Sequence, residues 1–288
     1  MQRRKFIQTS SYLAVGALLP AKAAGGCSRK QQLENIGLQL YTIREEMQRD
    51  GQEALRRVAE IGYDYVEGAG YRDGQLYGRS AKVFKALLES YGLQMPSGHV
   101  GWEAMKADPE RAAATCKEAG QSYVVVPYWP EEKRTAEGYA ELVEILNNGG
   151  KVCKEYGLKL AYHNHDFEFN KMVAGRRPMD MLLAEVDPDN VYFELDIYWI
   201  TRAGSDYQKY FAEHSGRFPL WHVKDMDDTP EKFFAAVGEG VIDWPEVFRR
   251  ENESGMQYFF VEQDLMRPGN QPMDQIAISH GYLEEMRY

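Results

Sequence analysis

The chain has 288 residues, 44% of them hydrophobic, and a formal net charge of −10. This length is enough for one large core, and it allows either two domains or one α/β barrel. An acidic chain without a basic patch interleaved with aromatic residues argues against a nucleic acid as the partner.

The first 26 residues have the pattern of an export signal. Arg3, Arg4 and Lys5 come before the short apolar run YLAVGALLP, and the small residues AKAAGG follow it. The run is too short for a membrane-spanning helix with flanking anchors. The adjacent arginines resemble a twin-arginine signal, which exports folded proteins, and an ordinary secretory signal is the alternative. We therefore expect an exported, periplasmic protein.

The three cysteines are not spaced closely enough for a disulfide framework or a zinc knuckle. Cys27 lies in AAGGCS, which weakly resembles a lipoprotein cleavage site, but no large aliphatic residue stands three positions before it. A soluble exported protein is therefore favoured over a lipid anchor at Cys27. Cys116 and Cys153 fall in predicted helices, where we expect them to face the core.

From about residue 35, short apolar segments alternate with longer amphipathic and charged ones. Apolar runs of this kind predict strands buried on both faces, as in a parallel sheet. The predicted strands cover residues 36–41, 63–68, 93–100, 122–129, 158–165, 191–198, 218–225 and 257–264. The predicted helices cover 52–62, 81–92, 109–120, 140–157, 178–186, 207–214, 243–255 and 273–288.

This alternation of eight strands with eight helices predicts a single-domain (β/α)₈ barrel over residues 33–288. An open doubly wound sheet is the alternative. It is weakened because IGLQLYTIRE, and not a glycine-rich phosphate loop, stands at the first strand and the turn after it. The glycine-rich segment 68–80 is better explained as an active-site loop than as a domain boundary.

Polar side chains stand at the ends of most predicted strands, where the active site of such a barrel lies. They are Glu67, His99, His163, His165, Asp196, His222, Lys224, Asp225, Glu262 and Asp264. Four of the six histidines of the chain belong to this set.

Strands five to eight present His163, Asp196, His222 and Glu262 in that order. Neighbouring strands lie about 4.8 Å apart, so the four side chains can converge on one point. Two imidazoles and two carboxylates suit Mn²⁺, Co²⁺, Fe²⁺, Zn²⁺ or Mg²⁺. Any one of them could instead cap a helix or bond a loop amide. The four together on consecutive strands predict a divalent metal site.

The stretch YHNHD places a second histidine beside this site. Side chains alternate along a strand, so His163 and His165 share one face. If that face is the barrel mouth, His163 lies level with the other ligands and His165 lies one step closer to the substrate. Asp166 and Glu168 begin the following loop, where Asp166 is either a partner that orients a histidine or a solvated acid.

On these residues the sequence resembles the xylose isomerase-like barrel superfamily, often labelled sugar phosphate isomerase/epimerase. The resemblance rests on GLQLYTIR, YHNHDFEF, the Asp of ELDIYW, WHVKD and VEQD. Members are divalent-metal enzymes that isomerise, epimerise or dehydrate sugars and cyclitols through an enediolate, and a DNA-repair endonuclease branch shares the barrel. YHNHD and HVKD look most like the inosose dehydratase and dehydroshikimate dehydratase branches.

The resemblance implies that Asp196, His222 and Glu262 are metal ligands. The family's fifth-strand ligand is usually a Glu, whereas this chain offers His163 there and His165 as the fallback. Many epimerases also carry a His three residues after the sixth-strand Asp. This chain has Trp199 at that position, so the base arrangement of sugar epimerases is not reproduced.

In the dehydratase branches, a fifth-strand His and a seventh-strand Lys contact the substrate and move protons, and His165 and Lys224 match them by position. A nearby cation would lower the pKa of Lys224 and help it act as a base. A surface salt bridge of Lys224 to Asp225 or Asp227 is the alternative. His165 and Glu168 are the other candidate acids or bases.

These residues predict a metal-dependent sugar isomerase or epimerase that acts on a keto- or aldo-sugar through an enediolate. The first alternative is a dehydratase or lyase that acts on a 3-keto-sugar or cyclitol. A non-catalytic sugar-binding barrel and a metal-dependent endonuclease are further alternatives. We expect an unphosphorylated carbohydrate as substrate, with Glu67, His99, Trp199 and Tyr41 as candidate contacts. A homo-oligomer is compatible with the sequence.

Overall fold

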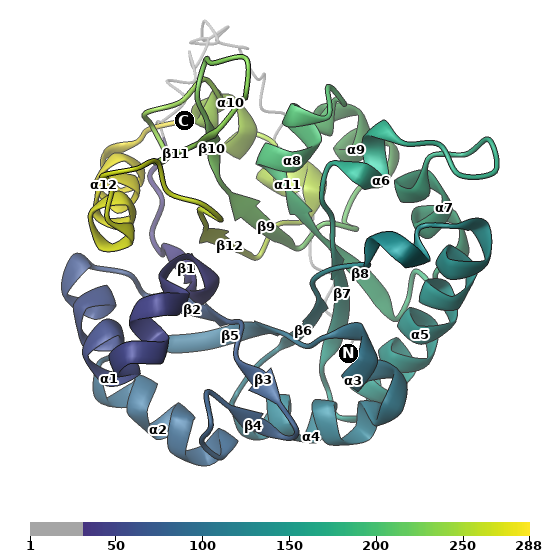
Figure 1. The fold of residues 1–288 in the computed structure, drawn as a ribbon, viewed down its shortest axis with the longest axis horizontal. Coiled ribbons are helices and arrows are strands. Elements are labelled where there is room, and N and C mark those ends of the chain that lie inside the picture. Colours follow the sequence, from purple (N-terminus) through teal and green to yellow (C-terminus); the bar gives the residue numbers. More distant parts are fainter. Residues whose placement is uncertain (1–30) are drawn as a thin grey trace, which may run out of the picture. The chain divides into compact units, whose positions relative to one another are not determined.

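Eight parallel strands close into a barrel within residues 31–288, the part of the chain that the computed structural model describes (Figure 1). In chain order they are β1 (Gly37–Gln39), β2 (Tyr65–Gly68), β5 (Gln94–His99), β6 (Tyr123–Val126), β7 (Lys159–His163), β8 (Val191–Asp196), β9 (Leu220–Val223) and β12 (Tyr258–Val261). Parallel pairing of β1 with β12 closes the ring. The predicted (β/α)₈ barrel is confirmed. The predicted export signal and Cys27 lie outside the described residues.

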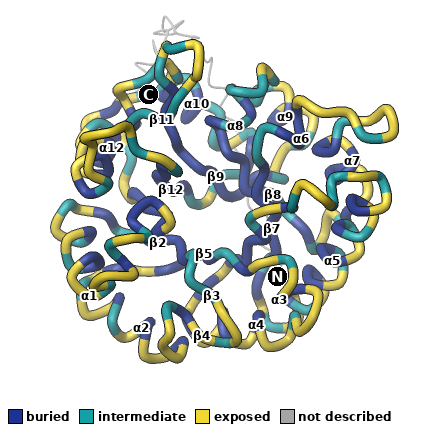
Figure 2. Tube along the Cα trace, in the orientation of Figure 1, coloured by how far each residue is buried: buried dark blue, intermediate teal, exposed yellow. Residues whose placement is uncertain are grey.

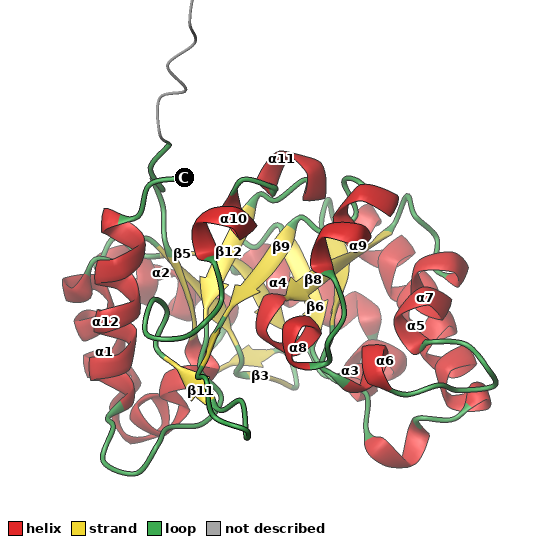
Figure 3. Cartoon of the chain, turned by 90° about the horizontal axis from the view of Figure 1, so that it is seen from above, coloured by secondary structure: helices red, strands yellow, loops and turns green. Residues whose placement is uncertain are grey.

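The predicted helices surround the barrel (Figure 3). They are α1 (Arg44–Ile61), α2 (Ala81–Ser90), α4 (Pro109–Glu118), α5 (Ala136–Glu155), α7 (Pro178–Glu185), α9 (Tyr207–Glu213), α10 (Trp244–Phe248), α11 (Glu251–Ser254) and α12 (Pro272–Glu285). The segment 243–255, expected as one helix, forms two because Arg250 leaves helical geometry, with φ −97° and ψ 5°. Within residues 31–288, no helix is long and apolar enough to cross a membrane.

Local sequence signals set several helix ends. Ser80 accepts a hydrogen bond from the Val83 backbone N–H at the start of α2. Asp108 accepts one from Arg111 at the start of α4, where Pro109 occupies a position that needs no N–H donor. Gly62 ends α1 with φ 116°, in the left-handed region where a side chain would be strained.

Shorter elements follow the C-terminal ends of the strands. They are η1 (Leu40–Ile43), β3 (Tyr71–Arg72), β4 (Gln75–Leu76), α3 (Trp102–Ala107), η2 (Glu131–Lys133), α6 (Phe167–Asn170), α8 (Ile197–Arg202), β10 (Asp225–Met226) and β11 (Phe234–Ala235). The glycine-rich segment 68–80 thus contains the small antiparallel pair β3–β4.

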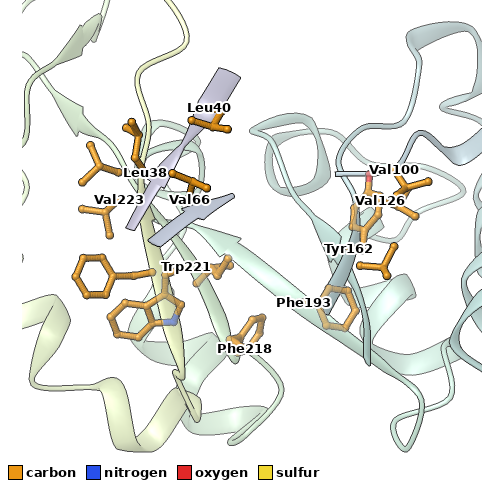
Figure 4. Close-up of a cluster of buried hydrophobic side chains, with 14 of the residues drawn as sticks. Leu38, Leu40, Val66, Val100, Val126, Tyr162, Phe193, Phe218, Trp221 and Val223 are labelled. Atoms are coloured by element: carbon orange, nitrogen blue, oxygen red, sulfur yellow. The ribbon is translucent and has the colours of Figure 1, made fainter. Parts of the chain in front are cut away.

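The main apolar core lies between the strands and the outer helices, and the helix faces turned to solvent are exposed (Figure 2). Leu38, Val66, Val126 and Trp221 are among its fully buried side chains (Figure 4). Each such side chain contributes roughly 1.5–3 kcal/mol to folding. Cys116 and Cys153 are buried in α4 and α5, as expected.

A second, smaller cluster is formed by Tyr123, Val125, Ala161, Leu220 and Phe260 on the strands themselves. Side chains alternate between the two faces of β7, so Ala161 packs in the smaller cluster and Tyr162 packs in the main core on the opposite face. His163 follows Ala161 on the same face, and therefore points into the barrel.

Candidate metal and catalytic site

A cavity of about 470 Å³ opens at the C-terminal ends of the strands, a volume typical of small-molecule sites. Its lining comes from strand ends and the loops that follow them. The lining residues are Tyr41, Ala69, His99, Pro127, Tyr128, His163, His165, Lys224, Glu262, Asp264 and Leu265.

The four predicted metal ligands meet beside this cavity: His163 and Glu262 line it, and Asp196 and His222 are fully buried next to them. His222 Nδ1 lies 2.7 Å from Glu262 Oε2 and 3.9 Å from Asp196 Oδ2. His163 Nε2 lies 3.6 Å from the same Asp196 oxygen. Asp196 and His222 stand opposite each other in the register of β8 and β9, which brings their side chains to one height.

The donor set fits a divalent cation. Asp196 Oδ2 and His222 Nδ1 are buried; Lys224 Nζ lies 2.9 Å from the first atom, and Glu262 Oε2 lies 2.7 Å from the second. One ligand atom each from Asp196, His222 and Glu262 lies within 4.8 Å of the others. Buried carboxylates that converge on one point are destabilising unless positive charge compensates them, and the nitrogen and oxygen donors of this group suit a shared divalent ion.

Lys224 neutralises this group of carboxylates. Its Nζ lies 2.9 Å from Asp196 Oδ2, 2.6 Å from Glu262 Oε2 and 2.7 Å from Asp264 Oδ1. Burial works against the charged ammonium, but the three carboxylates outweigh burial and hold the pKa of Lys224 well above its usual value. The carboxylates of the protein therefore raise the pKa of Lys224, whereas we expected a nearby cation to lower it.

A second layer of polar side chains lies beneath the proposed metal ligands. Glu194 Oε2 lies 3.1 Å from His163 Nδ1, 3.1 Å from His222 Nε2 and 3.2 Å from His99 Nε2. Glu67 Oε2 lies 2.6 Å from His222 Nε2. Both carboxylates are fully buried.

The register explains why this layer exists. Glu194 is two residues before Asp196 on β8, so both point into the barrel and Glu194 lies deeper. His163 stands opposite Glu194, and not opposite Asp196, in the pairing of β7 with β8. We expected His163 to lie level with the other ligands. Its backbone lies opposite Glu194 and therefore deeper, although its ring reaches up to Asp196.

A family model for the xylose isomerase-like TIM barrel matches residues 55–286 of this chain. The chain belongs to the xylose isomerase-like TIM barrel family. Inosose dehydratase from Geobacillus kaustophilus is 24% identical over 271 residues, which cover 80% of this chain and 82% of that protein. Inosose dehydratase from Lactiplantibacillus plantarum is 25% identical over 178 residues, or 55% of this chain and 56% of that protein.

Solved structures of xylose isomerase-like barrels extend this comparison. A sugar phosphate isomerase/epimerase from Parabacteroides distasonis is 26% identical, with a TM-score of 0.77, and covers 88% of this chain and 99% of its own. The IOLI protein with a bound zinc atom is 18% identical with a TM-score of 0.66, a likeness of fold alone. This member of the family is therefore an enzyme of the isomerase/epimerase or lyase type.

His165 lines the cavity beside the proposed ligands. Its ring stacks on Phe167 at 5.4 Å and lies 5.4 Å from the ring of Trp199. Burial, followed by the charge of Lys224, holds the pKa of His165 well below its usual value. A neutral imidazole therefore lines this cavity, and its Nδ1 is buried without a hydrogen-bond partner in the described part of the chain.

Glu168 takes a supporting place instead of the direct catalytic contact expected from the sequence. It lies in α6, where it accepts hydrogen bonds from the Tyr162 hydroxyl at 2.5 Å and the His165 backbone N–H at 2.8 Å. Its side chain is fully buried, and burial raises its pKa to about 7. The sequence did not show that the segment after His165 turns into a helix and directs Glu168 back to Tyr162.

The predicted substrate contacts divide into two groups. Tyr41 and His99 line the cavity. Glu67 lies beneath it, fully buried, because His99 and His222 stand between its carboxylate and the cavity. Trp199 stands behind the catalytic candidates, with its ring 5.8 Å from Lys224 Nζ.

Sequence reasoning missed Glu194 altogether. The spacing of Glu194 and Asp196 is the same as that of His163 and His165, so alternation along the strand could have placed it on the inner face. Tyr128 and Leu265 at the cavity mouth were missed as well, because they lie in loops whose paths the sequence did not show.

Proposed function

We propose that this enzyme is a divalent-metal-dependent isomerase or epimerase that acts on an unphosphorylated keto- or aldo-sugar through an enediolate. The observation that carries the proposal is the convergence of His163, Asp196, His222 and Glu262 beside the cavity that His163 and Glu262 line. A divalent ion held by these four side chains would polarise the substrate carbonyl and stabilise the negative charge of the enediolate. Mn²⁺, Co²⁺, Zn²⁺ and Mg²⁺ all suit this mixed set of nitrogen and oxygen ligands.

His165 and Lys224 are suited to move the proton. The neutral imidazole of His165 can accept a proton from the carbon beside the carbonyl. The protonated ammonium of Lys224 can donate one to an oxygen or carbon of the substrate. Trp199 lies near both side chains, with its ring 5.4 Å from the His165 ring and 5.8 Å from Lys224 Nζ.

The charge of the cavity favours a neutral substrate. Within residues 31–288, the lining includes the carboxylates of Glu262 and Asp264, and Lys224 is already paired with both. A sugar phosphate would bring two further negative charges to these acids. A free or oxidised sugar, or a glycoside, avoids that repulsion.

A dehydratase or lyase that acts on a 3-keto-sugar or cyclitol is the second candidate. It is favoured by the inosose dehydratase of Geobacillus kaustophilus, which aligns over 80% of this chain. Elimination needs one base and one acid near the leaving oxygen, and His165 and Lys224 could supply them. Epimerisation needs a proton-moving group on each face of the substrate, and Trp199 stands where many epimerases of this family carry a histidine.

Proton exchange in D₂O tests the shared first step. The full-length enzyme is incubated with Mn²⁺ or Co²⁺ and a panel of neutral keto-sugars and cyclitol ketones. We expect solvent deuterium beside the carbonyl, its loss in His222→Ala, and its retention in His214→Ala, a histidine at the end of α9. Product analysis then separates isomerisation from loss of water or alcohol. Sugar binding without proton exchange would favour a non-catalytic sugar-binding barrel. Salt-dependent cleavage of DNA would favour an endonuclease.

A further inference from the structure

Both histidines of the proposed metal site stand between two layers of carboxylates. His222 has Nδ1 2.7 Å from Glu262 and Nε2 2.6 Å from Glu67. His163 has Nε2 3.6 Å from Asp196 and Nδ1 3.1 Å from Glu194. Each imidazole therefore turns one nitrogen to a carboxylate of the proposed metal site and the other to a carboxylate beneath it.

In the lower layer Glu67 is already hydrogen-bonded, whereas Glu194 Oε1 is buried without a hydrogen-bond partner among residues 31–288. Glu67 accepts hydrogen bonds from the Ser97 hydroxyl and, at 2.7 Å, from the Gln39 side-chain amide. These donors stabilise an ionised carboxylate, which is the best acceptor for an imidazole N–H. Glu194 Oε2 is surrounded by ring nitrogens of three histidines at 3.1–3.2 Å.

The upper layer differs in this respect. Its atoms contact one another and the ammonium of Lys224: Glu262 Oε2 lies 2.7 Å from His222 Nδ1, and Lys224 Nζ lies 2.9 Å from Asp196 Oδ2. A second group, formed by His99, His163, Glu194 and His222, could also surround an ion, since its ligand atoms lie within 4.8 Å of one another. The hydrogen bonds already made by Glu67 favour the upper layer for the ion and the lower layer for proton-bearing nitrogens.

We propose that Glu194 and Glu67 are positioning residues that fix which nitrogen each ligand histidine offers to the metal. Glu194 accepts the Nδ1–H of His163, so that His163 binds through Nε2. Glu67, together with Glu194, accepts the Nε2–H of His222, so that His222 binds through Nδ1. This inference rests on the metal dependence of the proposed function. A carboxylate behind a ligand histidine fixes its tautomer and ring orientation, and its removal typically weakens metal binding by about 10- to 100-fold.

Replacing Glu194 and replacing Glu67 should affect different ligand histidines. Glu194 contacts both ligand histidines, whereas Glu67 contacts His222 and His99. Replacing Glu194 should therefore disturb both ligands, and replacing Glu67 should disturb His222 alone. A general loss of packing would not produce this difference.

Co²⁺ binding to the full-length protein tests the proposal without reference to activity. We expect Glu194→Gln to weaken Co²⁺ binding by about 10- to 100-fold and to alter the visible absorption spectrum of the bound ion. Asp225→Asn is the matched control. Asp225 is also fully buried, but it accepts from Gly238 N and Trp244 Nε1 at 2.9 Å. This control should lose stability and keep the Co²⁺ affinity and spectrum of the unmodified protein.

The ¹⁵N spectrum of the histidines in the Zn²⁺-loaded protein gives a second readout, which is available even if Glu194→Gln fails to fold. We expect Zn²⁺ on Nδ1 of His222 and on Nε2 of His163, with a proton on the opposite nitrogen of each. In Glu67→Gln the His222 signals should change and the His163 signals should not.

The outcomes separate the two proposals. If the unmodified protein binds neither Co²⁺ nor Zn²⁺, the proposed function fails. If it binds metal but Glu194→Gln binds Co²⁺ equally tightly, or if Zn²⁺ lies on Nε2 of His222, the positioning role is wrong and the metal site stands.

Discussion

The ammonium nitrogen of Lys224 lies 2.6 Å from Glu262 Oε2, the same oxygen that lies 2.7 Å from His222 Nδ1. A proposed proton donor and a proposed metal ligand therefore share one carboxylate oxygen. Lys224 also reaches Asp196, so its charge compensates two of the carboxylates that would hold the ion. The proposed catalytic lysine and the proposed metal ligands are thus one electrostatic unit.

This sharing predicts the behaviour of Lys224→Met. Without the ammonium, the buried carboxylates of Asp196 and Glu262 and the partly exposed carboxylate of Asp264 lose their common partner, which should lower the free energy of unfolding by about 3–5 kcal/mol. Mn²⁺ should restore much of this loss, so the metal-induced rise in Tm should be larger in Lys224→Met than in the unmodified enzyme. Thermal unfolding with and without Mn²⁺ measures both effects.

Turnover by the same variant tests the catalytic role of Lys224. We expect Lys224→Met to retain Mn²⁺ and to lose turnover. Lys209→Met, on the exposed face of α9, should leave both unchanged. An unchanged rate in Lys224→Met would remove this lysine from the mechanism.

Glu168 predicts a pH dependence of stability. Burial raises its pKa from 4.5 to about 7, so the folded state holds a proton that the unfolded state has already released in this interval. Its contribution to stability is therefore complete below about pH 4.5 and is lost as the pH rises through about 7. Glu168→Gln should become more stable relative to the unmodified protein, by roughly 3 kcal/mol, between about pH 5 and about pH 8.

Urea unfolding at the two pH values measures this difference. The amide introduced by Glu168→Gln could still accept from His165 N and could donate to the Tyr162 hydroxyl, so the variant should fold. Glu144→Gln, at an exposed position of α5, is the control and should follow the unmodified protein at both pH values. Parallel curves for all three proteins would contradict a buried, proton-holding Glu168.

Tyr41 is predicted to bind the sugar at the cavity mouth. It lines the cavity and is 44% exposed, and because the Arg44 guanidinium lies over one ring face, 4.3 Å from the ring centre, a sugar would stack on the other face. Tyr41→Ala should raise KM about fivefold and leave kcat nearly unchanged, because a contact at the mouth is made equally in the ground state and the transition state. Val83→Ala removes an exposed side chain on α2 and should change neither constant. A loss confined to kcat would place Tyr41 in the chemistry instead.

Export is predicted from residues outside the described part of the chain. Replacing both Arg3 and Arg4 by lysine should keep the protein in the cytoplasm if the signal is of the twin-arginine type, because the general charge of the region is retained. Cell fractionation of the two forms measures the result. Equal amounts in the periplasm would indicate an ordinary secretory signal.

The fold was predictable because its information is local and repeated. Apolar runs at β6 and β9 and glycines such as Gly62 at helix ends mark each βα unit without reference to distant residues. The inward direction of Asp196 and His222 follows from the same alternation. Closure of the barrel then brings the polar side chains at the strand ends close to one another.

The parts that were not predictable depend on loop paths and on depth within the barrel. The sequence identifies Glu67 as a strand-end acid, but only the packing of His99 and His222 above it shows that it lies beneath the cavity. The segment after His165 enters α6, which turns Glu168 away from the substrate. The raised pKa of Lys224 likewise depends on Asp264, whose position is set by the loop after β12.

The most direct test is the structure of the full-length enzyme crystallised with Mn²⁺, with the ion located by its anomalous scattering. We expect one ion about 2.0–2.3 Å from ligand atoms of His163, Asp196, His222 and Glu262, with Nδ1 of His222 and Nε2 of His163 facing it. An ion bound elsewhere, or crystals that take up no Mn²⁺ at millimolar concentration while these side chains keep their positions, would contradict the account.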